Sequence, residues 1–287
     1  MSSQSKLYIC GTPIGNLDDI TLRALNVLKE VDLIAAEDTR RTSKLLNHFE
    51  INTSLTSYHE HNEKQKSKKL ISKLLNNKDY KLALVSDAGV PGISDPGYEL
   101  ISKAIDSEIE VVPVPGPTAL ISALIVSGLP MNRFVFEGFI PREGKKRKKR
   151  LEKIIKEERT VIIYESPKRI KKTLKDLKKI AGNRKAAVVR EITKLHEEKI
   201  YGSITEILNK LDKNKLKGEY VLVLEGREKQ ENTENKLWQD MEIVEHVELF
   251  MDNGYTKKEA IKKVSEIRDL PKREVYKEAI AIEVNNI

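Results

Sequence analysis

Three short apolar runs, each followed by a loop rich in Gly and Pro, constrain the fold of this 287-residue chain most strongly. The runs and the loops after them are 7–10 with 11–16, 82–85 with 86–97, and 111–112 with 113–119. Short apolar runs between helical patterns are typical of buried parallel strands. In an open α/β sheet, ligands bind in the crevice beyond the carboxyl ends of such strands. The three loops together therefore predict a small-molecule binding site.

The first part of the chain alternates between strand and helix patterns. Further strands are expected at 33–36 and 55–58, and helices at 22–28, 42–49 and 64–75. This repeated alternation predicts a parallel sheet. We therefore expect an N-terminal α/β domain at residues 1–118. A chain of this length is near the upper size of a single core, so further domains are expected after it.

A second α/β domain is expected at residues 119–226. Thr118 is a good N-cap for a helix that runs to Ser127, and Gly128 then ends that helix. The remaining strands are expected at 134–140, 161–164, 186–189 and 220–224, with helices at 145–158 and 167–181 between them. The fold class predicted for residues 1–226 is therefore α/β, in two domains.

The last part of the chain is predicted to be a small helical module at residues 236–287, after a polar linker at 226–235. Its signals are an apolar stripe of Ile243, Val247, Phe250 and Met251, a capping box at 256–259, and a helix start at 270–274. Two short helices joined by a tight turn resemble a helix-turn-helix module. A plain helical hairpin docked on the body fits the pattern equally well.

The basic charge of the chain is concentrated in its middle. The net charge is +8, but residues 121–230 carry 29 Lys and Arg against 15 Asp and Glu, and the two flanking parts are slightly acidic. Such a field attracts polyanions through counterion release. Its densest part is the run 145–150, which follows a turn at 141–144 and is interpreted as a contact for phosphate backbones. The alternative is a set of solvated, Lys-rich helix faces.

Cysteine use and the absence of long apolar segments indicate the compartment. Cys10 is the one cysteine, so no disulfide can form within the chain, and its place in an apolar run predicts a buried strand residue. The first six residues lack the apolar core of a signal peptide, and the stretch 119–129 is too short to span a bilayer. We expect a cytoplasmic protein that is not bound to a membrane.

Known phosphate and metal motifs do not match. The segment 11–15 lacks the third glycine of a dinucleotide fingerprint and the Lys of a Walker loop. Asp87 and Asp95 either bind a ligand or cap local turns. The helix start at Thr118 suits a ligand carboxylate or phosphate, or is a rigid crossover turn. His59 and His61 have no spaced partner cluster, so no metal site is predicted.

Seven segments together resemble a known family. They are 11–17, 37–40, 86–97, 115–119, 164–169, 190–194 and 217–219. In this order, they are similar to the tetrapyrrole methylase-like (class III) S-adenosylmethionine methyltransferases, over residues 7 to about 226. Within that family, the resemblance is strongest to the bacterial branch that methylates the 2′-hydroxyl of a cytidine ribose in 16S ribosomal RNA. It implies S-adenosylmethionine in a cleft between two α/β domains, a homodimer, and ribosomal RNA or the small ribosomal subunit as partner.

The resemblance also implies site residues. Those implied for the cofactor are Thr12, Pro13 and Ile14 in the first loop, Asp87, Gly89 and Val90 in the second, Thr118 and Ala119 in the third, and Tyr164, Gly218 and Glu219 on the adenine side. A ribose hydroxyl must lose a proton to a general base or to water. The candidates for the base are Asp38, Glu191, Lys194 and His196, each of which could instead form a salt bridge or a turn contact. The side chains expected to hold RNA phosphates are Arg40, Arg41, Arg142, Lys145, Lys146, Arg147, Lys148, Lys149 and Arg150.

Two other functions stay open from the sequence. One is methylation of a small corrinoid or porphyrin, against which the basic middle segment argues, because a small substrate needs no polyanion field. The other is a non-catalytic RNA-binding or ribosome-assembly factor, against which the elaborate loops argue. Salt-sensitive RNA binding would distinguish RNA methylation from methylation of a corrinoid or porphyrin. Cofactor binding would distinguish RNA methylation from the function of a non-catalytic RNA-binding factor.

Overall fold

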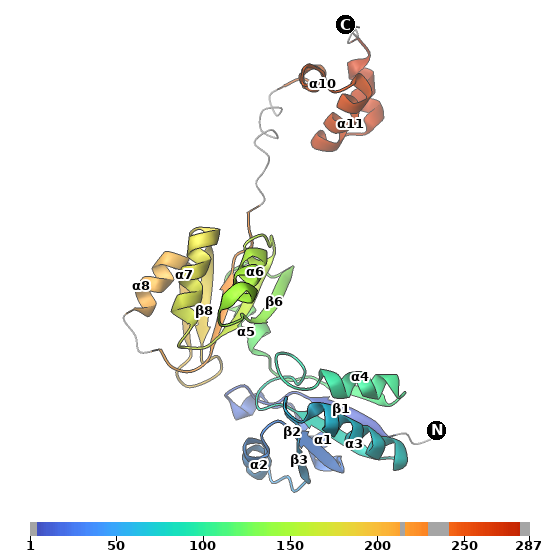
Figure 1. Ribbon diagram of the computed structural model, residues 1–287, viewed down its shortest axis with the longest axis vertical. Coiled ribbons are helices and arrows are strands. Elements are labelled where there is room, and N and C mark those ends of the chain that lie inside the picture. Colours follow the sequence, from blue (N-terminus) through green and yellow to red (C-terminus); the bar gives the residue numbers. More distant parts are fainter. Residues whose placement is uncertain (1–4, 213–215, 229–240, 282–287) are drawn as a thin grey trace. The chain divides into compact units, whose positions relative to one another are not determined.

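The computed structural model describes residues 5–212, 216–228 and 241–281, and it contains two five-stranded sheets followed by a helical unit (Figure 1). Residues 1–227 group into one compact unit and residues 228–287 into a second. The strands of the first sheet lie between residues 6 and 114, and those of the second between 134 and 224. The domain boundaries proposed from the sequence, at 118 and 226, remain predictions. Residues 229–235 of the expected linker lie outside the described residues.

The first sheet is parallel throughout, as the alternating pattern predicted, with the strand order β3-β2-β4-β1-β5. Its strands are β1 (Lys6–Cys10), β2 (Leu33–Ala36), β3 (Leu55–Ser57), β4 (Lys81–Val85) and β5 (Glu110–Val114). Its helices are α1 (Leu22–Glu30), α2 (Thr39–His48), α3 (Glu63–Asn76) and α4 (Tyr98–Asp106). Helix α4 was not predicted.

Both faces of the first sheet are buried. Along β2, Leu33 and Ala35 contribute to the core beneath α3 and α4, whereas Ile34 and Ala36 contribute to the core beneath α1 and α2. Successive side chains of a strand point to opposite faces, so a strand covered on both sides reads as one continuous apolar run. Cys10 is fully buried in the α1/α2 core, as predicted, and burial raises the pKa of its thiol to about 12.

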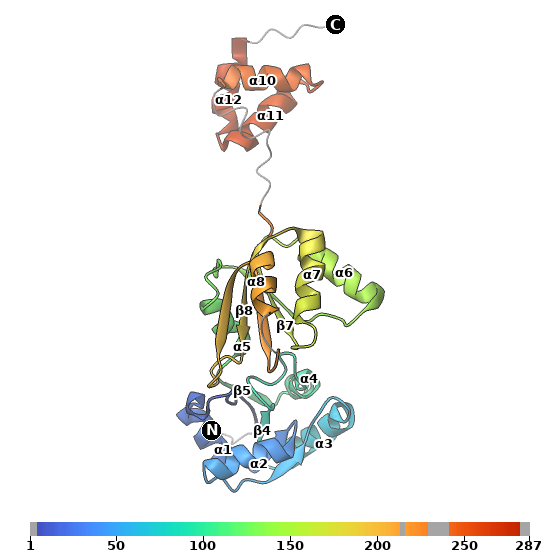
Figure 2. The same ribbon diagram turned by 90° about the vertical axis from the view of Figure 1, so that its left-hand side faces the viewer.

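The second sheet is mixed, in the order β6-β7-β10-β8-β9, and only β6 and β7 are parallel neighbours. The strands are β6 (Phe134–Phe139), β7 (Thr160–Glu165), β8 (Lys185–Arg190), β9 (Glu198–Ser203) and β10 (Tyr220–Leu224). The helices are α5 (Ala119–Ile125), α6 (Gly144–Ile154), α7 (Ile170–Ala181) and α8 (Ile204–Leu211). Helices α6, α7 and α8 cover one face, and α5 covers the other (Figure 2).

One residue of the first loop belongs to the core of the second sheet. Ile14, which follows β1, is 8% exposed and packs in the same cluster as α5 and the inner residues of β7, β8 and β10. The loop after β1 therefore reaches the α5 side of the second sheet.

The C-terminal unit contains, in its described residues, α10 (Ile243–Asp252), α11 (Lys257–Arg268), α12 (Lys272–Glu278) and the short 3-10 helix η2 (Ala279–Ala281), which form a small core of their own. Thr256 caps α11 through the predicted capping box with Glu259. From the predicted stripe, Val247 is fully buried, and Ile243, Phe250 and Met251 pack against it as partly buried side chains. Of the predicted module, 236–240 and 282–287 lie outside the described residues.

Candidate functional site

The loops after β1, β4 and β5 are joined by backbone contacts. Thr12 and Gly89 exchange two N–H···O hydrogen bonds of 2.9 and 3.0 Å, so the first two loops form a short antiparallel bridge. The Gly11 N–H donates to the carbonyl of Val114 at the end of β5. The strands β1 and β4 are neighbours, and the helices that follow them pack on opposite faces of the sheet. The crevice at such a switch point is where α/β sheets bind ligands.

Glycine is required where the first and third loops cross. A Cβ on Gly11 would lie 2.7 Å from the Cα of Gly116, and a Cβ on Gly116 would lie 2.7 Å from the Cα of Gly11. Both contacts are with backbone, so rotation of a side chain cannot relieve them. The crossing fixes the start of the segment that leads to α5.

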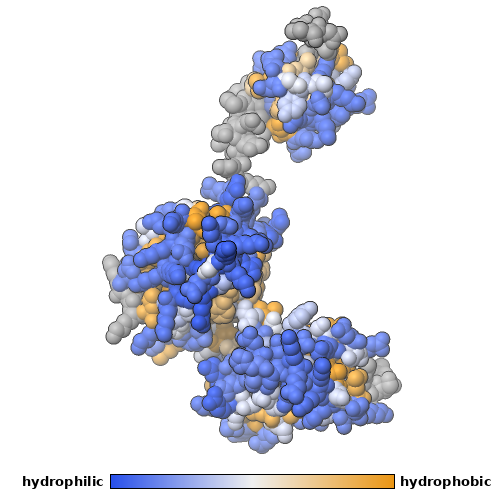
Figure 3. Space-filling view, viewed as in Figure 1, coloured by the Kyte–Doolittle hydropathy of each residue, from blue (hydrophilic) through white to orange (hydrophobic). Residues whose placement is uncertain are grey.

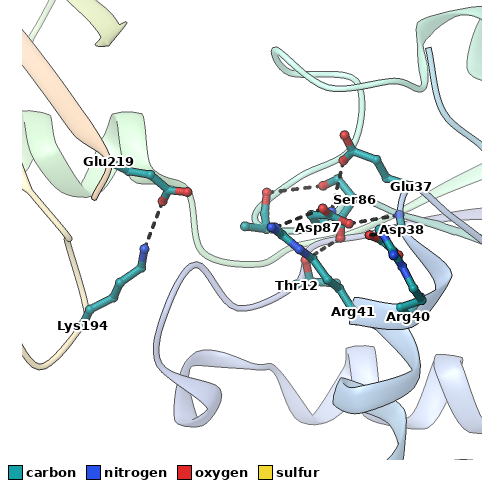
Figure 4. A network of polar contacts seen from close by, with 10 residues as sticks. Thr12, Glu37, Asp38, Arg40, Arg41, Ser86, Asp87, Lys194 and Glu219 are labelled. Atoms are coloured by element: carbon teal, nitrogen blue, oxygen red, sulfur yellow. Dashed lines mark hydrogen bonds and ion pairs between the residues drawn. The ribbon is translucent and has the colours of Figure 1, made fainter. Parts of the chain in front are cut away.

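A polar network ties the carboxyl ends of β2 and β4 together (Figure 4). The N–H of Asp38 donates to Oδ1 of Asp87 at 3.0 Å, and the N–H of Asp87 donates to Oε2 of Glu37 at 3.2 Å. The guanidinium of Arg41 lies 3.1 Å from Oδ2 of Asp87. Burial raises the pKa of Glu37, although the hydrogen bond from Asp87 opposes it. Asp87 is thus held at the junction of two loops.

Beyond these strand ends lies a cavity of about 510 Å³. Of the residues implied for the cofactor, those that line it are Ile14, Gly89, Val90, Thr118, Ala119, Tyr164, Gly218 and Glu219. The residues of β6, β7, β8 and β10 that contribute to its wall are Phe139, Tyr164, Glu165, Val189, Tyr220 and Val221. A mostly apolar pocket of this size with a few polar groups is typical of a small-molecule site.

Tyr164 fixes the helix that borders this cavity. Its hydroxyl accepts a hydrogen bond of 3.1 Å from the N–H of Leu120 in the first turn of α5, and burial raises its pKa to about 12. The ring of Tyr164 makes edge-to-face contacts with Phe136 and Phe139. Thr118 is the N-cap residue of α5, but its side chain makes no cap hydrogen bond. This helix ends at Ile125 rather than at the expected Ser127.

A second pocket, of about 450 Å³, adjoins the cavity. Ile14, Ala88 and Glu219 line both spaces. Thr12, Pro13 and Asp87, which the resemblance assigned to the cofactor, line the second pocket and not the cavity. The two spaces therefore divide the predicted cofactor residues between them.

The candidates for a general base lie in different surroundings. Asp38 caps α2 and accepts hydrogen bonds from Nε and Nη2 of Arg40, which holds the pKa of Asp38 far below its usual value. His196 is exposed and lines neither pocket. These positions favour a capping role for Asp38 over a role as base, and His196 stays a prediction without support from either pocket.

Glu191 and Lys194 form a bonded group with Glu219. Nζ of Lys194 lies 3.0 Å from Glu191 and 3.1 Å from Glu219, and Glu191 also accepts the N–H of Glu219. Burial would raise the pKa of Glu191, but the bonds from Glu219 and Lys194 outweigh it and lower this pKa. Burial would likewise lower the pKa of Lys194, but its two carboxylate partners raise it. Lys194 is therefore held as an ammonium, and Glu191 positions the turn at Gly218.

The basic run on α6 divides into exposed and buried members. Lys145, Lys146, Lys148 and Lys149 are exposed, and hydrophilic side chains cover this part of the surface (Figure 3). Arg150 is also exposed and lies 3.0 Å from Glu137. Arg147 is only 5% exposed, and its guanidinium donates to Asp176, Thr173 and the carbonyl of Pro141. The guanidinium of Arg147 is therefore engaged within the fold, which does not favour contact with RNA, and its assignment to RNA phosphates stays a prediction.

The other expected phosphate contacts are exposed. Arg40 and Arg41 lie on α2, and each is paired with an aspartate, Asp38 and Asp87 respectively. Arg142 is exposed in the turn before α6. Among the described residues, no group of three or more His, Cys, Asp or Glu side chains is arranged to hold a metal ion. The ring of His59 instead contacts the side-chain amide of Asn62.

Sequence reasoning missed part of the wall of each pocket. Ser94 of the second loop and Ser166 and Pro167 after β7 line the cavity, beside Asp95, which the sequence had offered as a ligand contact or a turn cap. Lys44, Leu45 and His48 of α2 line the second pocket. The spacing of Arg41, Lys44, Leu45 and His48, at three and four residues, is the signal that would have found the α2 side, since such positions share one helix face.

The carboxyl group of Asp95, which lines the cavity, makes the stability of the fold depend on pH. Burial raises the pKa of its carboxyl to about 6, and the charge of Glu37 adds to this. Between the ordinary value of 3.8 and pH 6, the native state therefore binds more protons than the unfolded chain, so stability falls as the pH rises through this window. We expect Asp95→Asn to raise the free energy of unfolding by about 1–2 kcal/mol at pH 7.5 and by little near pH 4.

Urea denaturation of both proteins at the two pH values measures this difference. Glu60→Gln, at an exposed turn position, is the matched control and should show no such difference. An equal effect of Asp95→Asn at both pH values would contradict the raised pKa.

The comparisons with known proteins agree with this architecture. The chain belongs to the tetrapyrrole (corrin/porphyrin) methylases, whose family model matches residues 6–208. Two relatives named ribosomal RNA small subunit methyltransferase I are similar over more than nine-tenths of the chain. The one from Halalkalibacterium halodurans is 48% identical over 94% of this chain and 93% of its own, and the one from Bacillus subtilis is 47% identical over 96% and 94%.

A solved structure shares the fold. Uroporphyrin-III C-methyl transferase from Thermus thermophilus, complexed with S-adenyl homocysteine, aligns with a TM-score of 0.54 over 77% of this chain and 97% of its own, at 17% identity. In the part of the chain that the structure describes, no helix combines the length and the apolar character needed to cross a membrane.

Proposed function

We propose that this protein transfers a methyl group from S-adenosylmethionine to the 2′-hydroxyl of a cytidine ribose in the 16S RNA of the small ribosomal subunit, in the cytoplasm. The observation that carries the proposal is the pair of adjoining pockets at the β1/β4 crevice, which offers one space for a cofactor and one for an acceptor. The similarity to two small-subunit RNA methyltransferases over more than nine-tenths of the chain supports the choice of RNA.

The residues around the larger cavity fit the proposed cofactor. Its apolar wall suits an adenine ring, and Asp95 and Glu219 provide carboxylates for hydroxyl or ammonium groups. Gly89, Val90, Thr118, Ala119 and Gly218 would bring backbone close to the ligand. When bound, S-adenosylmethionine supplies an electrophilic methyl group. The chain's own contribution is to hold the acceptor in line with that group, because such positioning supplies much of the rate in a transfer reaction.

We also infer a homodimer. Three of the side chains that line the cavity are apolar and exposed, since Ile93 is 48%, Ile121 is 39% and Phe139 is 57% exposed. Apolar side chains grouped in this way mark an interaction surface more often than scattered single ones do. Sedimentation equilibrium measures the state directly, since the chain has a mass of 32.7 kDa.

Methyl transfer tests the proposed reaction. Labelled S-adenosylmethionine is supplied with small ribosomal subunits from cells that lack this enzyme, and with naked 16S RNA in parallel, and the RNA is digested to nucleosides. We expect the label in 2′-O-methylcytidine. Label on a base, or no label from a protein that still binds the cofactor, would contradict the proposal, and in the second case transfer to a corrinoid or porphyrin would be tested next.

We expect the exposed lysines of α6 to bind RNA phosphates. Replacing Lys145, Lys146, Lys148 and Lys149 by Ser should weaken RNA binding roughly 10- to 100-fold near 0.1 M salt and lower its salt dependence, because each lost phosphate contact removes a released counterion. Cofactor affinity should not change. Filter binding over a series of KCl concentrations measures the first effect, and calorimetry measures the second.

Arg147→Ala is the matched control on the same helix. It leaves Asp176 and Thr173 without their buried partner, so we expect a loss of about 2–3 kcal/mol in the free energy of unfolding. The salt dependence of RNA binding by Arg147→Ala should equal that of the wild type. Loss of cofactor and RNA binding together in the lysine variant would show that these lysines support the fold.

A further inference from the structure

The second pocket has an ordered wall on α2. Thr42 and Leu46 are buried against the first sheet, and Asp38 caps the helix at its start. Arg41, Lys44, Leu45 and His48 follow at helical spacing and line the pocket, together with the buried Thr42. This face of α2 is therefore held rigidly by the core, while its cationic side chains remain exposed.

The basic side chains around this pocket differ in whether they already have a partner within the fold. Arg41 is paired with Asp87 at 3.1 Å, and across the pocket Lys194 is paired with Glu191 and Glu219. Lys44 is exposed and forms no ion pair or hydrogen bond with any residue that the structure describes. The ring of His48 contacts Phe49 edge to face, with its two nitrogens unengaged within the described chain. Lys44 and His48 thus offer donors that no carboxylate of the described fold occupies.

The position of the pocket links it to the cofactor cavity. Ile14, Ala88 and Glu219 form a wall common to both spaces, so a group seated against them from the second pocket lies beside the cavity. A volume of about 450 Å³ is within the usual range for a small-molecule pocket, and it suits one nucleotide. The cationic positions lie along an exposed helix face rather than in a closed hole, which suits a strand that continues in both directions.

We propose that this pocket receives the acceptor nucleotide of a single-stranded RNA segment, and that Lys44 and His48 bind the phosphates that flank its ribose. The proposal rests on the RNA methylation proposed above and adds the surface that positions its substrate. Phosphate contacts fix the register of a nucleic acid without reading its bases. Lys44 and His48 are thus positioning residues, which act on the reaction only through the placement of the ribose.

The test uses Lys44→Ala, His48→Ala and the double variant in the full-length protein. Asn47→Ala is the matched control, because Asn47 is exposed on the same helix and lines neither pocket. Binding of small ribosomal subunits, without cofactor, is measured over a series of KCl concentrations. For the double variant we expect roughly tenfold weaker binding near 0.1 M salt, and a slope of log K against log salt that is lower by about 0.7 for each lost phosphate contact.

Steady-state transfer supplies the second readout. We expect the double variant to raise KM for the subunits about tenfold and to change kcat less than threefold, with unchanged affinity for S-adenosylmethionine. A double variant that matches Asn47→Ala in salt slope and KM would overturn the proposal, as would equal loss of cofactor binding. If the wild type itself transfers no methyl group to RNA, the proposed function fails, and the cofactor-free binding series still decides whether Lys44 and His48 contact phosphates.

Discussion

Ala88→Trp should abolish methyl transfer while leaving the protein folded. Ala88 is exposed, follows β4, and lies in the wall that the cavity and the second pocket share. An indole at this position would project into the space where cofactor and acceptor must meet. We expect at least a 100-fold loss of kcat/KM, equivalent to about 2.7 kcal/mol or more of lost transition-state stabilisation. Cofactor affinity should fall about tenfold or more.

Transfer kinetics, calorimetry with S-adenosylmethionine and urea denaturation together measure these effects. Lys78→Trp places the same side chain at an exposed position that lines neither pocket, and it should resemble the wild type in all three. The free energy of unfolding of Ala88→Trp should stay within about 1 kcal/mol of the wild type, as for most surface substitutions. Undiminished transfer by a folded Ala88→Trp would place the reaction elsewhere.

Gly116→Ala should have the largest effect on stability. Its new Cβ would lie 2.7 Å from the Cα of Gly11 and 3.0 Å from the carbonyl oxygen of Gly11. Only a shift of the backbone can relieve this overlap, and such a shift separates the loops after β1 and β5. We expect a loss of about 2–4 kcal/mol in the free energy of unfolding, together with weaker cofactor binding, because both loops border the site.

Gly128→Ala is the control, because it measures the backbone strain of replacing a glycine where the new Cβ meets no other atom. Gly128 has φ of +70°, and a Cβ there meets nothing within 4 Å, so only the left-handed backbone opposes alanine. That strain costs about 1–2 kcal/mol. Urea denaturation of both variants should rank Gly116→Ala as the more damaging of the two. The opposite order would contradict the close crossing of the two loops.

The first sheet was predictable because its strands are covered on both faces. Burial on two sides gives continuous apolar runs such as 33–36 and 82–85, and these runs stand out from the amphipathic helices around them. The strand β9 was missed because it lies at the edge of the second sheet, where Ile200 is the one buried residue of its six. Helix α8 was also missed, although Ser203 and Glu206 form a capping box that the sequence displays.

The loops that form the candidate site were predictable from the sequence. The division of their residues between two pockets was not. Motif resemblance grouped Thr12 and Asp87 with Val90 and Ala119, but the first two line one pocket and the last two line the other. Chain order cannot reveal this division, because it depends on how the loops fold over each other. The burial of Arg147 is similar in origin, since its partner Asp176 lies 29 residues away on α7.

The central claim is that one cavity at the β1/β4 crevice holds the cofactor beside a separate pocket for the acceptor. A crystal structure of the protein with S-adenosylhomocysteine tests it most directly. We predict that the ligand lies in the 510 Å³ cavity, against Val90, Ala119, Tyr164 and Gly218, and leaves the face of α2 free. A ligand seated instead against Lys44 and His48 in the second pocket would contradict the account.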